Sequence, residues 1–126
     1  MTQPVVHFEI IGSDPGRLRA YYGELFGWGF DTSGPVAEAV SDTGQYGFTE
    51  PPAEGPGIPG GVGGGEGHGP HVVFYVGVLD VVAALIEAER LGGTRRMGPE
   101  TAPGGGLVIG HFTDPEGNLI GVAGVG

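Results

Sequence analysis

Two stretches of the chain share one pattern, and this internal duplication constrains the fold more than any other feature of the sequence. The first stretch, VVHFEIIGSDPGRLRAYYGELFGW, covers residues 5–28, and the second, PHVVFYVGVLDVVAALIEAERLGG, covers residues 70–93. Each has a histidine on a short apolar run, then a turn containing Asp, then apolar residues at helical spacing, and each ends near glycine. A chain of 126 residues built in this way is expected to form two related halves that share one core.

The predicted order of elements is β-α-β-β-β in each half. Ser13 or Asp14 is expected to cap the first helix, and Asp80 the second. Further strands are expected near 28–32, 45–49 and 58–62 in the first half, and near 94–98, 106–113 and 118–123 in the second. The DPEG sequence at 114–117 is typical of the type I turn in a hairpin. The predicted fold class is therefore α+β, with two βαβββ repeats that form a cup-shaped mixed sheet and helices on the outside.

The repeats are expected to form one domain over residues 1–126, with repeat one at about 1–64 and repeat two at about 70–126. Between them, residues 51–70 read PPAEGPGIPGGVGGGEGHGP. Such a composition favours a loop or linker between the halves. A mobile flap over a binding site is the functional alternative.

Strand alternation separates the residues of each strand into two faces. The apolar sets expected beneath the helices are Val6, Phe8 and Ile10 on the first strand and Val72, Phe74 and Val76 on the strand that opens the second repeat. His7, Glu9, His71 and His111 are expected on the opposite face, which is the inside of the cup. Two neutral imidazoles with a carboxylate are suitable ligands for a divalent metal.

The composition excludes several classes of partner. The chain has five Lys and Arg residues against fifteen Asp and Glu residues, which gives a net charge of −10. It would be repelled by the phosphate backbone of a nucleic acid. No apolar run has the roughly 18 residues that a membrane helix needs, and a cytoplasmic location is expected. The sequence contains no cysteine, so disulfide bonds and thiolate metal ligands are excluded.

The two repeats, together with the closing FTDPEGNLIGV, resemble the vicinal oxygen chelate superfamily, which includes glyoxalases, bleomycin resistance proteins and extradiol dioxygenases. The resemblance implies homodimers and a metal in the cup, with one ligand from each of four strands. His7 and His71 match two of these ligands. The other two positions fall at Gly121 and around Gly60 to Gly63, where no ligand is available.

Two functions follow from this resemblance. In the first, the protein is a metal-assisted lyase, isomerase or dioxygenase, with His7 and His71 as metal ligands and with Glu9 and His111 as the catalytic acid–base groups or as replacement ligands. Zn²⁺, Ni²⁺ or Fe²⁺ would then be held weakly. In the second, the protein binds a small molecule without metal and without catalysis, as drug-sequestering members of the superfamily do. Either function takes a small molecule as its ligand.

Overall fold

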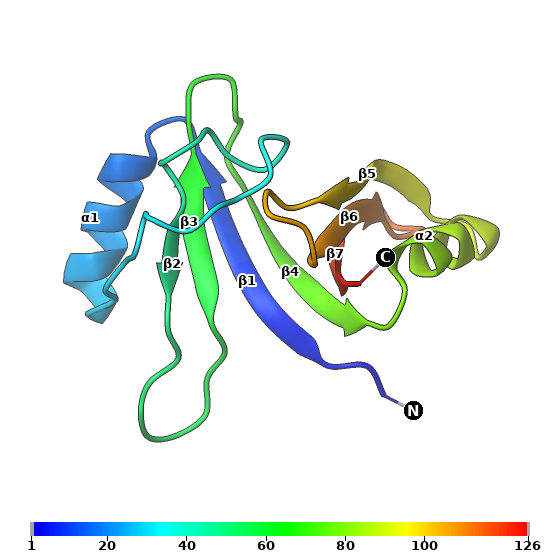
Figure 1. Cartoon of the computed structure of the whole chain (residues 1–126), viewed down its shortest axis with the longest axis horizontal. Helices are drawn as coiled ribbons and strands as arrows, with labels where there is room; N and C mark the ends of the chain where they lie inside the picture. Colours follow the sequence, from blue (N-terminus) through cyan, green and yellow to red (C-terminus); the bar gives the residue numbers. More distant parts are fainter. Residues whose placement is uncertain (1, 126) are drawn as a thin grey trace. The chain divides into compact units, whose positions relative to one another are not determined.

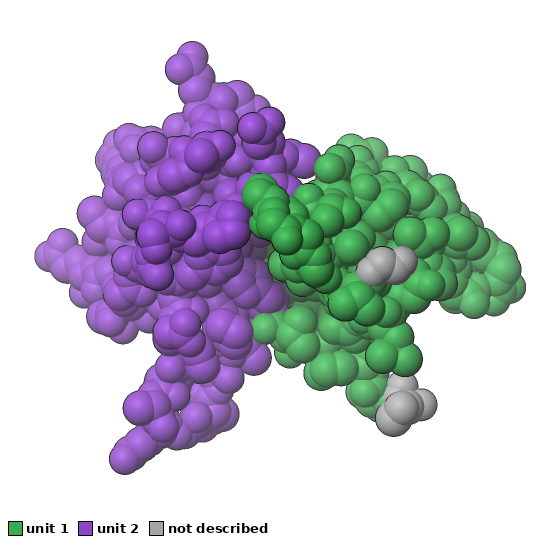
Figure 2. All heavy atoms as spheres, in the orientation of Figure 1, with its two compact units in different colours: residues 1–6, 73–126 green, residues 7–72 purple. Residues whose placement is uncertain are grey.

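The structure is a computed structural model that describes residues 2–125 and divides the chain into two compact units. Unit 2 comprises residues 7–72, and unit 1 comprises residues 1–6 and 73–126 (Figure 2). The described residues form seven strands and two helices (Figure 1). They are β1 (Val5–Gly12), α1 (Pro15–Phe26), β2 (Gly47–Thr49), β3 (Gly60–Gly64), β4 (His71–Val78), α2 (Val81–Arg90), β5 (Thr94–Thr101), β6 (Val108–Thr113) and β7 (Leu119–Gly124). The predicted α+β class is confirmed.

Unit 2 contains α1 and the strand order β2-β3-β1, with β3 parallel to β1 and antiparallel to β2. Asp14 caps α1 by accepting a hydrogen bond from the backbone N–H of Arg17, and Pro15 occupies the first turn. The helix ends at Gly27, which has a φ of +73°, a conformation that glycine adopts without steric cost. The helix packs along β3 (Figure 1), and Ile11 and Val62 are buried in this unit.

Unit 1 contains α2 and the strand order β4-β7-β6-β5, with β4 parallel to β7 and the other pairs antiparallel. Asp80 caps α2 through the backbone N–H of Ala83, as predicted. The predicted hairpin joins β6 and β7, and its turn is closed by a 2.9 Å hydrogen bond from the N–H of Gly117 to the carbonyl of Asp114. The buried apolar residues of α2 pack on the sheet in a core of Val81, Leu85, Val108 and Val122.

Three expectations about local structure need correction. The strand expected near 28–32 is reduced to a single bridge between Asp31 and Phe48, because the aromatic rings that follow α1 pack on the helix. The Trp28 ring, for example, is stacked on Tyr22 with 5.7 Å between centroids. The Gly- and Pro-rich run at 51–70 is only partly a loop, since it contains β3. All five residues of that strand are buried.

The third correction concerns the apolar set expected beneath a helix on β4. Val72 and Phe74 are 66% and 41% exposed, whereas Val73 and Tyr75 are almost completely buried. The reason is that α2 packs on β5, β6 and β7 and leaves that face of β4 uncovered. Val76 of the same set pairs with Val122 of the α2 core, so strand alternation predicted the helix side of β4 but not that the helix stops short of Val72 and Phe74.

Candidate functional site

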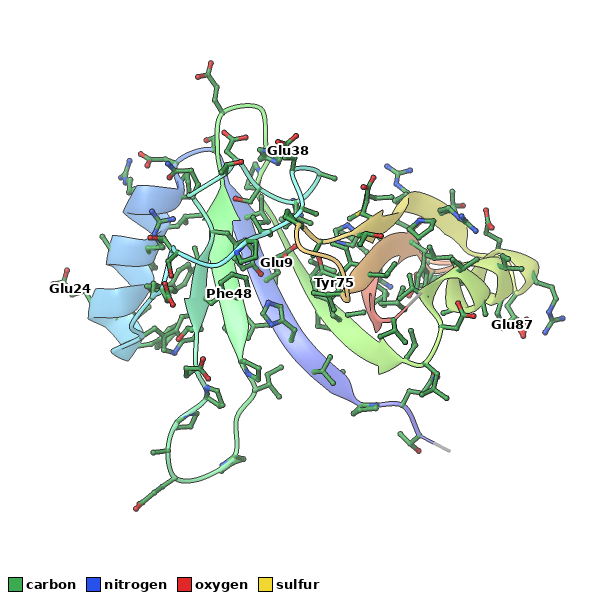
Figure 3. All side chains as sticks on the ribbon, in the orientation of Figure 1. Glu9, Glu24, Glu38, Phe48, Tyr75 and Glu87 are labelled. Carbon is green, nitrogen blue, oxygen red and sulfur yellow. The ribbon has the colours of Figure 1, made fainter. Side chains whose placement is uncertain are left out.

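Three polar side chains of unit 2 form a hydrogen-bonded chain. The hydroxyl of Tyr46 donates to Oε1 of Glu9 at 3.0 Å, and Nε2 of His7 lies 2.9 Å from the same hydroxyl. Glu9 and Tyr46 are each only 2% exposed, while His7 is half-buried. Figure 3 labels Glu9 of β1 and also Phe48 of β2, whose ring centroid lies 4.7 Å from that of Tyr46. We call this set the His7–Tyr46–Glu9 network.

Strand alternation places His7 and Glu9 on one face of β1, and the segment before β2 brings Tyr46 over them. That segment is anchored at the end of β3. The N–H of Gly64 donates to the Ser41 hydroxyl at 2.9 Å, and the N–H of Asp42 donates to the Gly64 carbonyl at 2.8 Å. Ser41 is completely buried. The segment that leads to Tyr46 is therefore held at the end of β3 by these two hydrogen bonds.

The Tyr46 ring also explains the glycines at positions 61 and 63 of β3. A Cβ atom on Gly61 would lie 2.0 Å from Cε1 of Tyr46, and one on Gly63 would lie 2.7 Å from its Cδ2. Real Cβ contacts are essentially never this short. The space beside β3 is thus filled by the aromatic ring, and any side chain on the strand at Gly61 would displace it.

The protonation of the network follows from its hydrogen bonds and burial. Tyrosine has one hydroxyl proton, and Tyr46 donates it to Glu9. Nε2 of His7 is then the donor to the Tyr46 oxygen, which assigns the Nε2–H tautomer of the imidazole. Burial lowers the pKa of His7 below its ordinary value of 6.5, because desolvation disfavours the charged form. His7 is therefore neutral at pH 7.

Unit 1 contains a second pair of the same kind. The hydroxyl of Tyr75 and Nε2 of His111 are 2.7 Å apart, and both residues are buried. A Cβ atom on Gly121 of β7 would lie 2.5 Å from Cδ2 of Tyr75. In each unit, therefore, a tyrosine that is hydrogen-bonded to histidine fills the space beside a glycine of a neighbouring strand.

Each predicted site residue has a polar partner within its own unit. His7 and Glu9 come together through Tyr46, and His111 pairs with Tyr75. His71 is elsewhere: its Nδ1 lies 3.0 Å from the Gly69 carbonyl, and it lines a surface pocket of about 610 Å³ beside α1. Tyr46 was not predicted. The signal that points to it is the run of glycines at 60–64, which indicates a strand closely approached by a bulky neighbour.

The residues present do not fit the metal centre that the family resemblance implies. Within residues 2–125, no three His, Cys, Asp or Glu side chains gather closely enough to hold an ion. The positions expected to carry the two further ligands lie at Gly121 and within Gly60 to Gly63, and tyrosine rings pack against Gly61, Gly63 and Gly121. The assignment of His7 and His71 as metal ligands stays a prediction.

Comparison with known structures identifies the fold. A methylmalonyl-CoA epimerase variant from Streptomyces coelicolor in complex with 2-nitronate-propionyl-CoA matches with a TM-score of 0.64 and 16% identity, over 99% of this chain and 96% of the epimerase. A member of the glyoxalase/bleomycin resistance protein/dioxygenase superfamily from Vibrio splendidus 12B01 matches with a TM-score of 0.53 and 14% identity, over 98% and 99% of the two chains. Sequence identities as low as these show only that the fold is shared.

No curated protein matches the sequence. Neither α1 nor α2, the two helices among residues 2–125, is long and apolar enough to span a membrane. The sequence pattern described as "Glyoxalase/Bleomycin resistance protein/Dioxygenase superfamily" matches residues 5–122, which is nearly the whole chain. The protein therefore belongs to the glyoxalase/bleomycin resistance protein/dioxygenase superfamily.

Proposed function

We propose that the protein is an enzyme of the isomerase or lyase type that moves a proton on a small carbonyl compound, and that the His7–Tyr46–Glu9 network carries that proton. The single observation that supports this proposal is the hydrogen-bonded chain from a half-buried imidazole to a fully buried carboxylate. General acid–base catalysis needs a base that is neutral at the working pH and held within reach of the substrate. Neutral His7, at the more exposed end of the network, meets the first of these needs.

The proposed reaction begins when the imidazole of His7 takes a proton from the carbon next to a carbonyl group. The C–H bond breaks, its electron pair forms the enolate, and the imidazole becomes an imidazolium. The buried Glu9 carboxylate stabilises that positive charge through the Tyr46 hydroxyl. Return of the proton to the adjacent carbon on the same face completes an isomerisation, and loss of a leaving group from the enolate completes an elimination.

The charge of the protein bears on the class of substrate. The epimerase structures contain acyl-CoA compounds, in one case methylmalonyl-CoA itself. The present chain has a net charge of −10 and no lysine, and such a surface repels a polyanion such as a coenzyme A thioester. We therefore favour a carbonyl substrate without phosphate groups.

The test is exchange of the acidic C–H proton in D₂O, followed by ¹H NMR over a panel of 1,3-dicarbonyl and 2-hydroxycarbonyl compounds, with methylmalonyl-CoA as the anionic comparison. We expect enzyme-dependent exchange with at least one phosphate-free compound. Glu9→Gln and His7→Gln should each slow it by about 10²–10⁴-fold, the usual contribution of a general acid or base. Tyr21→Phe, which removes a hydroxyl from a 60% exposed side chain of α1, should leave the rate unchanged.

Two results would contradict this proposal. Exchange that persists at the wild-type rate in Glu9→Gln would show that the network does not carry the proton. Absence of exchange across the whole panel, together with saturable binding of one of its members, would replace the enzyme by the non-catalytic binding protein.

A further inference from the structure

A second pocket of unit 2 lies between the C-terminal end of α1, β1 and the loop that joins β2 to β3. Its volume is about 680 Å³. The walls are mainly aromatic and apolar, and the lining residues include Phe8, Phe26, Trp28, Pro52 and Glu50. Figure 1 shows the end of α1 and the β2–β3 loop at the same end of this unit.

The aromatic wall of this pocket is formed by three rings. The centroid of the Trp28 ring is 5.2 Å from that of Phe8 and 5.1 Å from that of Phe26, with interplanar angles of 47° and 40°. The rings therefore form a corner rather than a flat stack. The Phe26 side chain is 57% exposed. The face of an aromatic ring, and of Trp above all, attracts a cation that lies within about 6 Å of its centroid.

The opposite wall comes from the β2–β3 loop, and local packing fixes its shape. A Cβ atom on Gly57 would lie 2.7 Å from Cδ of Pro52, so the two limbs of the loop are in contact across the turn. Proline at 51 and 52 restricts the backbone further. The pocket is thus bounded by a loop whose two limbs pack together beside the aromatic corner.

The electrostatics of the pocket favour a positively charged ligand. Among the described residues that line it, Glu50 is the one charged side chain, and it is exposed. The whole chain carries a charge of −10, so a cation is attracted from solution and an anion is repelled. Aromatic ring faces beside a carboxylate are a typical environment for a substituted ammonium group.

We propose that this pocket binds a small organic cation, namely a quaternary or tertiary ammonium group attached to a short apolar or hydroxylated chain. The site is distinct from the His7–Tyr46–Glu9 network. Phe8 follows His7 on β1, and strand alternation directs their side chains to opposite faces. The cation site therefore does not depend on the proposed function and stands or fails separately from it.

The experiment uses Trp28, the one tryptophan of the chain, as a fluorescent reporter. Wild-type protein is titrated with choline and with its uncharged isostere 3,3-dimethyl-1-butanol, with excitation at a wavelength that selects tryptophan. We expect a saturable change in Trp28 emission, with choline binding at least about fivefold more tightly than the isostere, as a cation–π contribution of about 1 kcal/mol implies. Equal affinities for the two compounds, or no saturable change with choline, would overturn the proposal.

Three variants locate the effect. Glu50→Gln should weaken choline binding about three- to tenfold and leave the isostere unaffected. Phe26→Leu, which keeps an apolar side chain but removes the ring, should also weaken choline binding severalfold. Glu54→Gln is the matched control, because it removes the same charge from the same loop at a residue that does not line the pocket. If Glu54→Gln weakens choline binding as much as Glu50→Gln, the cation responds to overall charge and the pocket is not its site.

Discussion

Substitution of Gly61 by alanine tests the packing on which the His7–Tyr46–Glu9 network depends. The added Cβ would lie 2.0 Å from Cε1 and 2.1 Å from the hydroxyl oxygen of Tyr46. The ring must move by about 1.4 Å to restore a 3.4 Å contact, and a shift of that size breaks hydrogen bonds of 2.9 and 3.0 Å. Overpacking costs about 1–3 kcal/mol, and loss of the hydrogen bond from Tyr46 to the buried Glu9 carboxylate costs about 1–3 kcal/mol more. We expect Gly61→Ala to lower the free energy of unfolding by about 2–6 kcal/mol.

The assay is urea unfolding followed by Trp28 fluorescence and by far-ultraviolet circular dichroism. Gly69→Ala is the matched control, because a Cβ at that position meets no atom within 4 Å and its φ lies outside the left-handed region. It should change the free energy of unfolding by less than about 0.5 kcal/mol. In a Tyr46→Ala background the clash is absent, so adding Gly61→Ala there should cost little, and the difference between the two backgrounds measures the coupling.

The reasoning would be refuted if Gly61→Ala were as stable as Gly69→Ala. It would also be refuted if Gly61→Ala cost the same with and without the Tyr46 ring. Either result would mean that the space beside β3 can accept a side chain and that the tyrosine is not wedged against the strand.

Gly121→Ala should lower the free energy of unfolding by about 1–3 kcal/mol, measured in urea, because its Cβ would lie 2.5 Å from the Tyr75 ring. Burial lowers the pKa of His7 below 6.5, so the unfolded chain takes up the proton first as the pH falls. Stability should decline below about pH 6.5 until the folded pKa is reached, and His7→Gln should flatten that part of a urea series. Leu85→Ala, in the unit 1 core, should cost about 2–5 kcal/mol, whereas Ile86→Ala, at a 55% exposed position, should stay within about 0.5 kcal/mol in thermal melts. Light scattering should give twice the 12.8 kDa of one chain if the predicted homodimer forms, and a 12.8 kDa particle would contradict it.

Local signals in the sequence predicted most of the regular elements. The caps Asp14 and Asp80 and the DPEG hairpin all involve residues within four positions of one another, and interactions of that range can be read from spacing. Strand alternation likewise predicted that His7 and Glu9 share a face of β1. The repeated pattern of these signals was sufficient to predict the fold class and the superfamily.

Long-range packing decided the rest. Tyr46 is 37 residues from Glu9 and 39 from His7 in the sequence, and no local rule brings it between them. The same holds for β4, where the position of α2 on β5, β6 and β7 leaves Val72 and Phe74 exposed. The sequence shows that Gly61 and Gly121 provide no metal ligand. It does not show why glycine is needed there, because the tyrosine ring that packs against each of them is brought into place only when the chain folds.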